Sequence, residues 1–450
     1  MVCTRWIRFR HRINSNLLSE NMEPKRRRFL RQLATTAGAL TFTPFLQTAA
    51  GRDLLSALEE YERFPADRLA VDETFWRQVR QAYTVSPTVL YLNSGGVCPQ
   101  PKVVQEAVER YNRLSNEGPA FYMWQVLDKG REPLREKLAD LAGCSPEEIA
   151  VNRNASEALE TVIFGLPLTA GDEVVLSRYD YPNMINAWKQ RELRDGIRLN
   201  WIDLDLPMED DEAIVQRYAA AFTPATKVVH ITHVINWTGQ ILPAARIAEA
   251  AHRQNIEVLV DGAHSFAHLD YRIPDLGCDY FGTSLHKWMC APFGSGMLYV
   301  RKEKIAGLYP LFAAPEPGSD DIRKFEALGT RSFAIEQAIG QAVDFHLLIG
   351  AERKEKRLHF LKNYWAEQVA ELPWAQLHTS LKPEFGCAIG LLNMEGMKPG
   401  ELAQTLFREH QIFTVAIEWE KASGIRVTPN VFTLQSELDR FVEALKTIAS

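Results

Sequence analysis

A carboxylate and an amine stand at the ends of two apolar runs in the middle of the chain. The run Val-Leu-Val at 258–260 leads directly into Asp261, and a later run at 279–284 leads into a segment that holds Lys287. A lysine amine can attack a carbonyl carbon, and a carboxylate can stabilise a positive charge beside it. Alone, a strand-end aspartate is often a helix cap and a lysine is usually solvated. Here both residues follow the carboxyl ends of strands, which is where α/β sheets bind ligands. Together they indicate a functional site.

The elements around these residues alternate in type. From about residue 130 onward, helical patterns alternate with short, nearly continuous β-branched runs, as in strands that are buried on both faces of a largely parallel sheet. The runs lie at 148–151, 173–176, 198–202, 227–232, 257–260, 280–282 and 297–300. This pattern predicts an α/β fold.

The pattern changes after a helical stretch at 335–372. Apolar runs at 387–392, 412–417 and 424–427 are then interleaved with helical patterns at 399–410 and 436–448. This is typical of a smaller α+β domain. We therefore predict four parts: an N-terminal extension with a signal peptide (1–50), an arm (51–95), a large domain (96–340) and a small C-terminal domain (341–450).

Three motifs carry a family resemblance: Asp-Gly-Ala-His at 261–264, Ser-Leu-His-Lys-Trp at 284–288 and Gly-Ser-Gly-Met-Leu-Tyr-Val at 294–300. They resemble the class V aminotransferase family, the pyridoxal 5'-phosphate (PLP) enzymes of fold type I that include isopenicillin N epimerase and the cysteine desulfurases. The likeness extends from residue 91 to the final helix. It implies a large domain with a mainly parallel seven-stranded sheet, a small α+β domain, and PLP as cofactor.

The resemblance gives the first two residues their roles. Lys287 matches the lysine whose amine condenses with the PLP aldehyde and later moves protons at the substrate Cα. Asp261 matches the carboxylate that keeps the ring nitrogen protonated, so that the ring can accept electrons.

Four further residues match the family's phosphate site. Ala155 and Ser156 open a helix after the run at 148–151, and Ser284 and His286 precede the lysine. The segment could instead be a plain helix start with Asn154 or Ser156 as its cap. Capping and phosphate binding use the same free amides, so both can hold.

Three residues are expected beside the cofactor ring. His264 corresponds to the residue near the phenolic oxygen. Tyr181 is favoured for stacking on the ring face, although Tyr179 is possible and either could be a core aromatic. His233 matches a position that faces the cofactor. Alternatively, it is a strand-end histidine whose ring nitrogens are hydrogen-bonded within the protein.

Two residues depend on long-range geometry. Thr330, in Gly-Thr-Arg at 329–331, resembles the ligand that reaches across a homodimer to the neighbouring subunit's phosphate. Arg426 resembles the guanidinium that grips the substrate's α-carboxylate as a bidentate fork, the alternative being a surface arginine.

The N-terminus has the layout of an export signal. Residues 1–31 hold nine basic side chains against two acidic ones, and residues 32–50 hold no charge. Arg26-Arg27-Arg28 resembles a twin-arginine (Tat) signal, and Met22 is a possible native start. The apolar stretch 33–46 is too short for a stable membrane span, and small residues precede Gly51 for cleavage. We expect a Tat translocase partner and a periplasmic or otherwise exported protein. A basic head that stays attached is the alternative.

Other classes of protein find less support. The net charge of −6 does not favour nucleic acid, and the six cysteines form no C-x-x-C pair for zinc. Neither G-x-G-x-x-G nor G-x-x-x-x-G-K-[ST] occurs, which argues against a nucleotide-binding α/β protein.

The sequence predicts a PLP enzyme acting at the Cα of an amino acid or another small amino donor. Transamination ranks first, ahead of epimerisation and C–S or β-elimination, and a non-catalytic PLP-fold binding protein is the alternative of another class. Cysteine desulfurases carry a mobile thiol shortly before the carboxylate-binding arginine. Between Cys387 and Arg426 this chain has no cysteine. Cys387 itself lies in an apolar run expected to be a buried strand, so persulfide chemistry is disfavoured.

Overall fold

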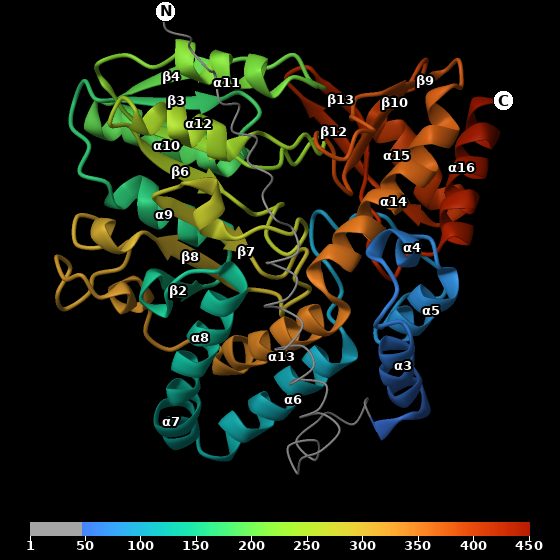
Figure 1. The fold of residues 1–450 in the computed structure, drawn as a ribbon, viewed down its shortest axis with the longest axis horizontal. Helices are drawn as coiled ribbons and strands as arrows, with labels where there is room; N and C mark the ends of the chain where they lie inside the picture. Colours follow the sequence, from blue (N-terminus) through green and yellow to red (C-terminus); the bar gives the residue numbers. More distant parts are fainter. Residues whose placement is uncertain (1–46) are drawn as a thin grey trace, which may run out of the picture. The chain divides into compact units, whose positions relative to one another are not determined.

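A computed structural model describes residues 47–450 of the chain, so the twin-arginine motif and the apolar stretch 33–46 lie outside the described residues. A seven-stranded sheet has the order β2-β8-β7-β6-β5-β3-β4 and lies in the left half of the view in Figure 1. Only β8 runs antiparallel to its neighbours. The strands are β2 (Ile149–Asn152), β3 (Glu173–Ser177), β4 (Arg198–Ile202), β5 (Thr226–Thr232), β6 (Glu257–Asp261), β7 (Tyr280–Ser284) and β8 (Gly296–Val300). The predicted α/β fold with a mainly parallel sheet is confirmed.

Helices cover this sheet, so its strands are largely buried, except for the edge strand β4, which is mostly half-exposed. The helix that follows β2 packs its alanine and leucine side chains against β7 and leaves its first turn at the edge of the sheet. The helices are α8 (Arg131–Ala142), α9 (Ala155–Gly165), α10 (Pro182–Asp195), α11 (Asp211–Ala220) and α12 (Ala244–His252), with short helical turns η4 (Pro146–Glu148), η5 (Ile273–Leu276) and η6 (Lys302–Lys304).

A second, antiparallel sheet has the order β12-β13-β10-β9. Its core is shared with three helices. The elements are α14 (Ala351–Ala370), β9 (Ala375–Leu377), β10 (Gly390–Met394), α15 (Pro399–His410), β12 (Val415–Trp419), β13 (Ala422–Val427) and α16 (Gln435–Ala449). Trp419 pairs with Ala422, so β12 and β13 are joined by a turn of two residues.

Two predicted strand boundaries are wrong. The run at 387–392 becomes a strand only at Gly390, because the amide of Ala388 donates to His268 Nε2 (3.0 Å) and not to a neighbouring strand. The run at 412–417 divides at Thr414. Its first part, β11 (Ile412–Phe413), pairs in parallel with β1 (Leu90–Tyr91), and its second part begins β12.

The N-terminal part of the described chain is helical. Within it, α4 (Ala66–Ala70) packs on α14, and α6 (Lys102–Glu117) packs on α13 (Phe333–Ile349). Arg80 forms an ion pair with Glu437 (2.7 Å), and Arg357 donates to the carbonyl of Ala70 (2.9 Å). The first helix begins at Ala49, so the expected cleavage point before Gly51 lies in its first turn. The helices are α3 (Ala49–Glu60), α4 (Ala66–Ala70), α5 (Glu73–Gln81), α6 (Lys102–Glu117), α7 (Pro119–Phe121), the turns η2 (Tyr122–Leu127) and η3 (Asp128–Gly130), and later α13 (Phe333–Ile349).

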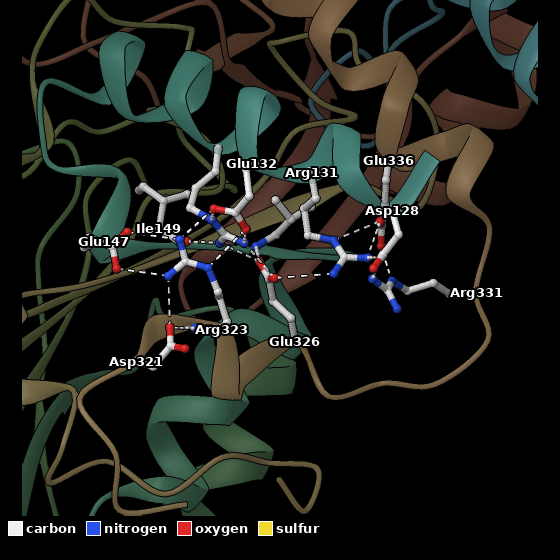
Figure 2. Close-up of polar contacts among 12 residues, drawn as sticks. Asp128, Arg131, Glu132, Glu147, Ile149, Asp321, Arg323, Glu326, Arg331 and Glu336 are labelled. Atoms are coloured by element: carbon white, nitrogen blue, oxygen red, sulfur yellow. Dashed lines mark hydrogen bonds and ion pairs between the residues drawn. The ribbon is translucent and has the colours of Figure 1, made fainter. Parts of the chain in front are cut away.

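A buried ion-pair network fixes the segment between the turn η7 (Ile322–Glu326) and α13 (Figure 2). Glu326 accepts from both guanidinium nitrogens of Arg135 on α8 (2.7 and 2.9 Å) and from the amide of Val151 (2.6 Å). Glu336, at the start of α13, binds the guanidinium groups of Arg131 and Arg331. The network thus holds both ends of the segment that contains Thr330.

Residues 47–450 lack two features. No helix there is long and apolar enough to cross a bilayer. No group of three or more histidine, cysteine or acidic side chains in that range is placed to hold a metal ion.

Candidate active site

A cavity of about 190 Å³ opens where β6 and β7 end and α9 begins. Parallel strands bring their carboxyl ends to one edge, and the crossover helix starts there with free amides. The lining residues are Gly96, Asn154, Ala155, Ser156, Leu159, Tyr181, Met184, Thr232, Asn236, Asp261, Ala263, His264, Ser284, His286 and Lys287. Eight of the predicted site residues are among them.

Asp261 and Lys287 share this cavity. Asp261 is the last residue of β6, and its Oδ1 accepts from the amide of Ala263 (2.9 Å). Burial raises the pKa of Asp261, and the charge of Lys287 opposes that rise. Burial lowers the pKa of Lys287 to about 8. The cavity therefore holds an amine that is partly neutral near neutral pH and a carboxylate that favours a cationic partner.

His264 lies against the lysine. Its Nε2 is 3.0 Å from Lys287 Nζ, and burial lowers the pKa of the imidazole well below its usual value. The end of β6 thus supplies the carboxylate, and the turn after it supplies a neutral ring beside the amine.

The opposite end of the cavity is built for an anion. Asn154 caps α9 by accepting from the amide of Glu157 (2.9 Å), and Ser284 Oγ accepts from the amide of Ala155 (2.9 Å). Ser156 and His286 complete this end, and His286 Nδ1 donates to the carbonyl of Ser295 (3.1 Å). Hydroxyls at a helix start suit a phosphate.

Tyr181 is on the cavity wall and Tyr179 is not. Lys287 Nζ lies 5.8 Å from the centre of the Tyr181 ring, which is partly exposed. Tyr179 is buried at 2% exposure. The structure therefore places the favoured tyrosine, and not its alternative, where a planar ring could stack.

Three predicted residues do not line the cavity. His233 lies behind Asp261, with its amide donating to the carbonyl of Asp261 (3.0 Å) and its ring against Tyr271 (5.1 Å between centroids). Burial lowers the pKa of His233 to about 4. Thr330 is exposed on the segment before α13.

Arg426 does not line the cavity but contacts one residue that does. Its guanidinium donates to the carbonyl of Asn236 (3.0 Å), a lining residue, and to Asn93 Oδ1 (2.9 Å). Its Nε is buried without a hydrogen-bond partner among the described residues. Burial lowers the pKa of Arg426 to about 10.

Several cavity residues escaped sequence reasoning. Thr232 ends β5 and could have been found by reading every strand end, since its neighbour Asp261 ends β6. Asn236 and Gly96 sit in loops with no motif to mark them. Asn93 is brought to Arg426 by contacts between parts of the chain far apart in sequence.

The residues present fit PLP. The helix start with Ser156 and Ser284 suits a phosphate, Asp261 suits a protonated ring nitrogen, and Lys287 lines the same cavity. When bound, PLP supplies an aldehyde for the lysine and a ring that withdraws electrons from the substrate Cα.

Comparison with known proteins agrees with this fit. The family described as aminotransferase class V matches residues 90–416. Isopenicillin N epimerase of Streptomyces clavuligerus is 29% identical over 83% of this chain and 98% of its own length. A probable cysteine desulfurase of Halalkalibacterium halodurans is 32% identical over 71% of this chain and 81% of its own length.

Solved structures show the same fold. A variant of C-DES with glycine covalently linked to its PLP cofactor aligns with TM-score 0.73 at 23% identity, over 80% of this chain and 96% of that one. The cysteine desulfurase CsdA of Escherichia coli aligns with TM-score 0.72 at 20% identity, over 83% and 98%. The chain belongs to the class V aminotransferase family, has the fold of type I PLP enzymes, and takes pyridoxal 5'-phosphate as its cofactor.

Proposed function

We propose that this protein is an exported PLP-dependent aminotransferase that acts at the Cα of an amino acid or a related amino compound. The observation that carries the proposal is the common cavity of Lys287 and Asp261, closed at its other end by the start of α9. A non-catalytic binding protein would not need a buried amine with a pKa of about 8 beside such a carboxylate.

Lys287 is the proposed proton carrier. A general base works best when its pKa lies near the working pH, and burial brings this amine into that range. His264 Nε2 at 3.0 Å holds the amine in place within the cavity.

Arg426 is the proposed partner of the substrate carboxylate. Its buried Nε has no partner in the described part of the chain, and its other two nitrogens already fix the guanidinium plane. An anion beside it would offset the burial that lowers its pKa, and the fork geometry favours a carboxylate.

Epimerisation is the second candidate, because the epimerase relative matches over 98% of its own length. Persulfide chemistry of the desulfurase type is disfavoured by the hairpin β12–β13. The two strands of this hairpin are joined by a two-residue turn before Arg426, and the hairpin contains no cysteine. Cys387 is fully buried, and burial raises the pKa of its thiol to about 12.

The test begins with the cofactor. Borohydride reduction and peptide mapping should place a pyridoxyl group on Lys287, and Lys287→Ala should abolish it. Lys302→Ala, which changes an exposed lysine, is the matched control. A pyridoxyl group on Lys302 or Lys304, or none at all, would overturn the assignment.

The reaction type follows from products in D₂O. Each candidate begins with loss of the Cα proton, so amino acid substrates should exchange it for deuterium. Keto acid formed with transfer of the amino group supports transamination, and racemised substrate without keto acid supports epimerisation. Sulfide from cysteine would instead support C–S cleavage.

We also propose a homodimer in which Thr330 contacts the neighbouring subunit's phosphate site. Thr330 is exposed, yet the ion-pair network holds its segment at both ends, which suits a residue presented to a partner. Mixed dimers of Lys287→Ala and Thr330→Ala subunits should recover activity, because one of the two sites keeps both native residues. If the mixture is no more active than its parents, Thr330 has no role across the interface.

Export by the Tat pathway remains a proposal that rests on residues 26–28. Replacing Arg26 and Arg27 by lysine keeps the charge and should abolish translocation, because a receptor reads the pair. An unchanged periplasmic yield would argue for another route.

A further inference from the structure

Trp288 points its indole back at the histidine that contacts the lysine. Its Nε1 lies 3.4 Å from His264 Nδ1, and the other ring nitrogen, Nε2, lies 3.0 Å from Lys287 Nζ. Trp288 is fully buried and His264 is 5% exposed, so water does not compete for these contacts.

These contacts decide where His264 carries its proton. An indole N–H can only donate, so His264 Nδ1 must accept. Burial, together with the charges of Lys287, Arg426 and His268, holds the pKa of His264 well below its usual value, so the ring is neutral. A neutral imidazole that accepts at Nδ1 carries its proton at Nε2. That proton points at Lys287 Nζ, and only the neutral form of an amine can accept it.

The indole is itself held in place. The His268 ring stacks on Trp288 with centroids 3.7 Å apart. His268 Nδ1 donates to the carbonyl of His264 (2.8 Å), and its Nε2 accepts from Ala388 (3.0 Å). The carbonyl of Trp288 accepts from the buried amine of Lys354.

We propose that Trp288 is a positioning residue for the catalytic lysine: its indole N–H selects the Nε2-protonated tautomer of His264, and this tautomer stabilises the neutral amine of Lys287. The inference rests on the proposed role of Lys287. It adds a residue that does not line the cavity.

The other charges around the amine do not replace this effect. Asp261 and Cys98 favour the ammonium, whereas Arg426 and burial disfavour it. His286 lies on the same turn, and burial lowers its pKa, so it is neutral as well. His264 is the group in hydrogen-bonding contact with Nζ.

The test compares two buried tryptophans. Trp288→Phe removes the N–H that binds His264. Trp365→Phe removes an N–H that has no partner among the described residues, at a site that is also fully buried. The first measurement is the tautomer of His264 in the cofactor-free protein, read from imidazole ¹⁵N shifts and assigned with His264→Gln. Native protein and Trp365→Phe should show Nε2–H, and Trp288→Phe should show a mixture of tautomers.

The second measurement is the pH dependence of the reaction of Lys287 with added PLP, followed by absorbance. In Trp288→Phe the other tautomer offers Nε2 as an acceptor to the ammonium, so the apparent pKa of Lys287 should rise by about 0.5 to 1 unit. Trp365→Phe should leave it unchanged.

Three results would overturn the inference: a native His264 protonated at Nδ1, an unchanged tautomer in Trp288→Phe, or equal pKa changes in both variants. If Trp288→Phe does not fold, the tautomer of the native protein decides alone. Failure of Lys287 to take up PLP in the native protein would instead refute the proposed function, whatever the tautomer of His264.

Discussion

Replacing Glu326 by glutamine removes one charge from the ion-pair network and keeps the shape of the side chain. The Glu326 side chain is 4% exposed, and its partner Arg135 is fully buried. Oε1 accepts from Arg135 and from the amide of Val151, and Oε2 accepts from the second nitrogen of Arg135. Glutamine has only one side-chain oxygen. Its NH₂ group must therefore face an N–H group that also donates.

The expected loss follows from this geometry. Removing one partner of a buried ion pair costs about 3 to 5 kcal/mol, because the remaining charge is left uncompensated. Arg135 keeps Glu132 at 3.1 Å, an exposed carboxylate that compensates only in part. We therefore expect Glu326→Gln to lower the free energy of unfolding by about 3 kcal/mol.

Urea denaturation of the cofactor-bound protein, followed by circular dichroism, measures this loss. Glu316→Gln, which neutralises an exposed acid on the preceding loop, is the matched control and should change stability by less than about 0.5 kcal/mol. The double variant Arg135→Met with Glu326→Leu should recover part of the loss, since neither charge is left alone. The reasoning would be refuted if the unfolding free energy of Glu326→Gln lay within about 1 kcal/mol of the native value. It would also be refuted if the double variant lost more stability than Arg135→Met and Glu326→Leu lose in sum.

Three other changes have defined outcomes. Burial raises the pKa of Asp180 to about 7 from 3.8, so its protonated form stabilises the fold below pH 4 and this contribution is lost as the pH rises through 7. Asp180→Asn should therefore flatten the fall in unfolding free energy between pH 4 and 7, and an unchanged slope would contradict the assignment. Arg426→Lys should raise KM for amino acids more than 10-fold while PLP content stays constant, and an equal rise for amines that lack a carboxylate would exclude carboxylate binding. Cys387→Ser should not change sulfide release from cysteine, and loss of release with PLP still bound would restore a desulfurase reading.

The strand-end residues were predictable because local sequence carries their signal. A parallel strand buried on both faces is a continuous apolar run, and the residue that ends the run stands at the binding edge. Asp261 and Lys287 were found this way, whereas Ser284 was found through the family resemblance. The N-terminal turn of α9 was predictable for the same reason, because its cap and its free amides depend on a few consecutive residues.

The remaining parts of the site depend on contacts that no local pattern records. Arg426 meets Asn93 because Asn93 pairs with Thr428, and that pairing joins distant parts of the chain. Strand boundaries failed for a similar reason: Ala388 looks like a strand residue, but its amide bonds to His268. Trp288 stood in the motif, yet its role depends on which nitrogen of His264 it reaches.

The ion-pair network and the phosphate end of the cavity share one strand. Glu326 binds the amide of Val151, and the chain then passes through Asn152 to Asn154, which caps α9. On the other side, Gly296 of β8 lets the Asn154 backbone approach so closely that a Cβ there would lie 2.6 Å from it. The first turn of α9 is thus positioned by β2 and β8 together, whereas Asp261 ends β6 and Lys287 lies in the turn after β7. Loosening Glu326 should therefore weaken phosphate binding before it disturbs the geometry of the lysine.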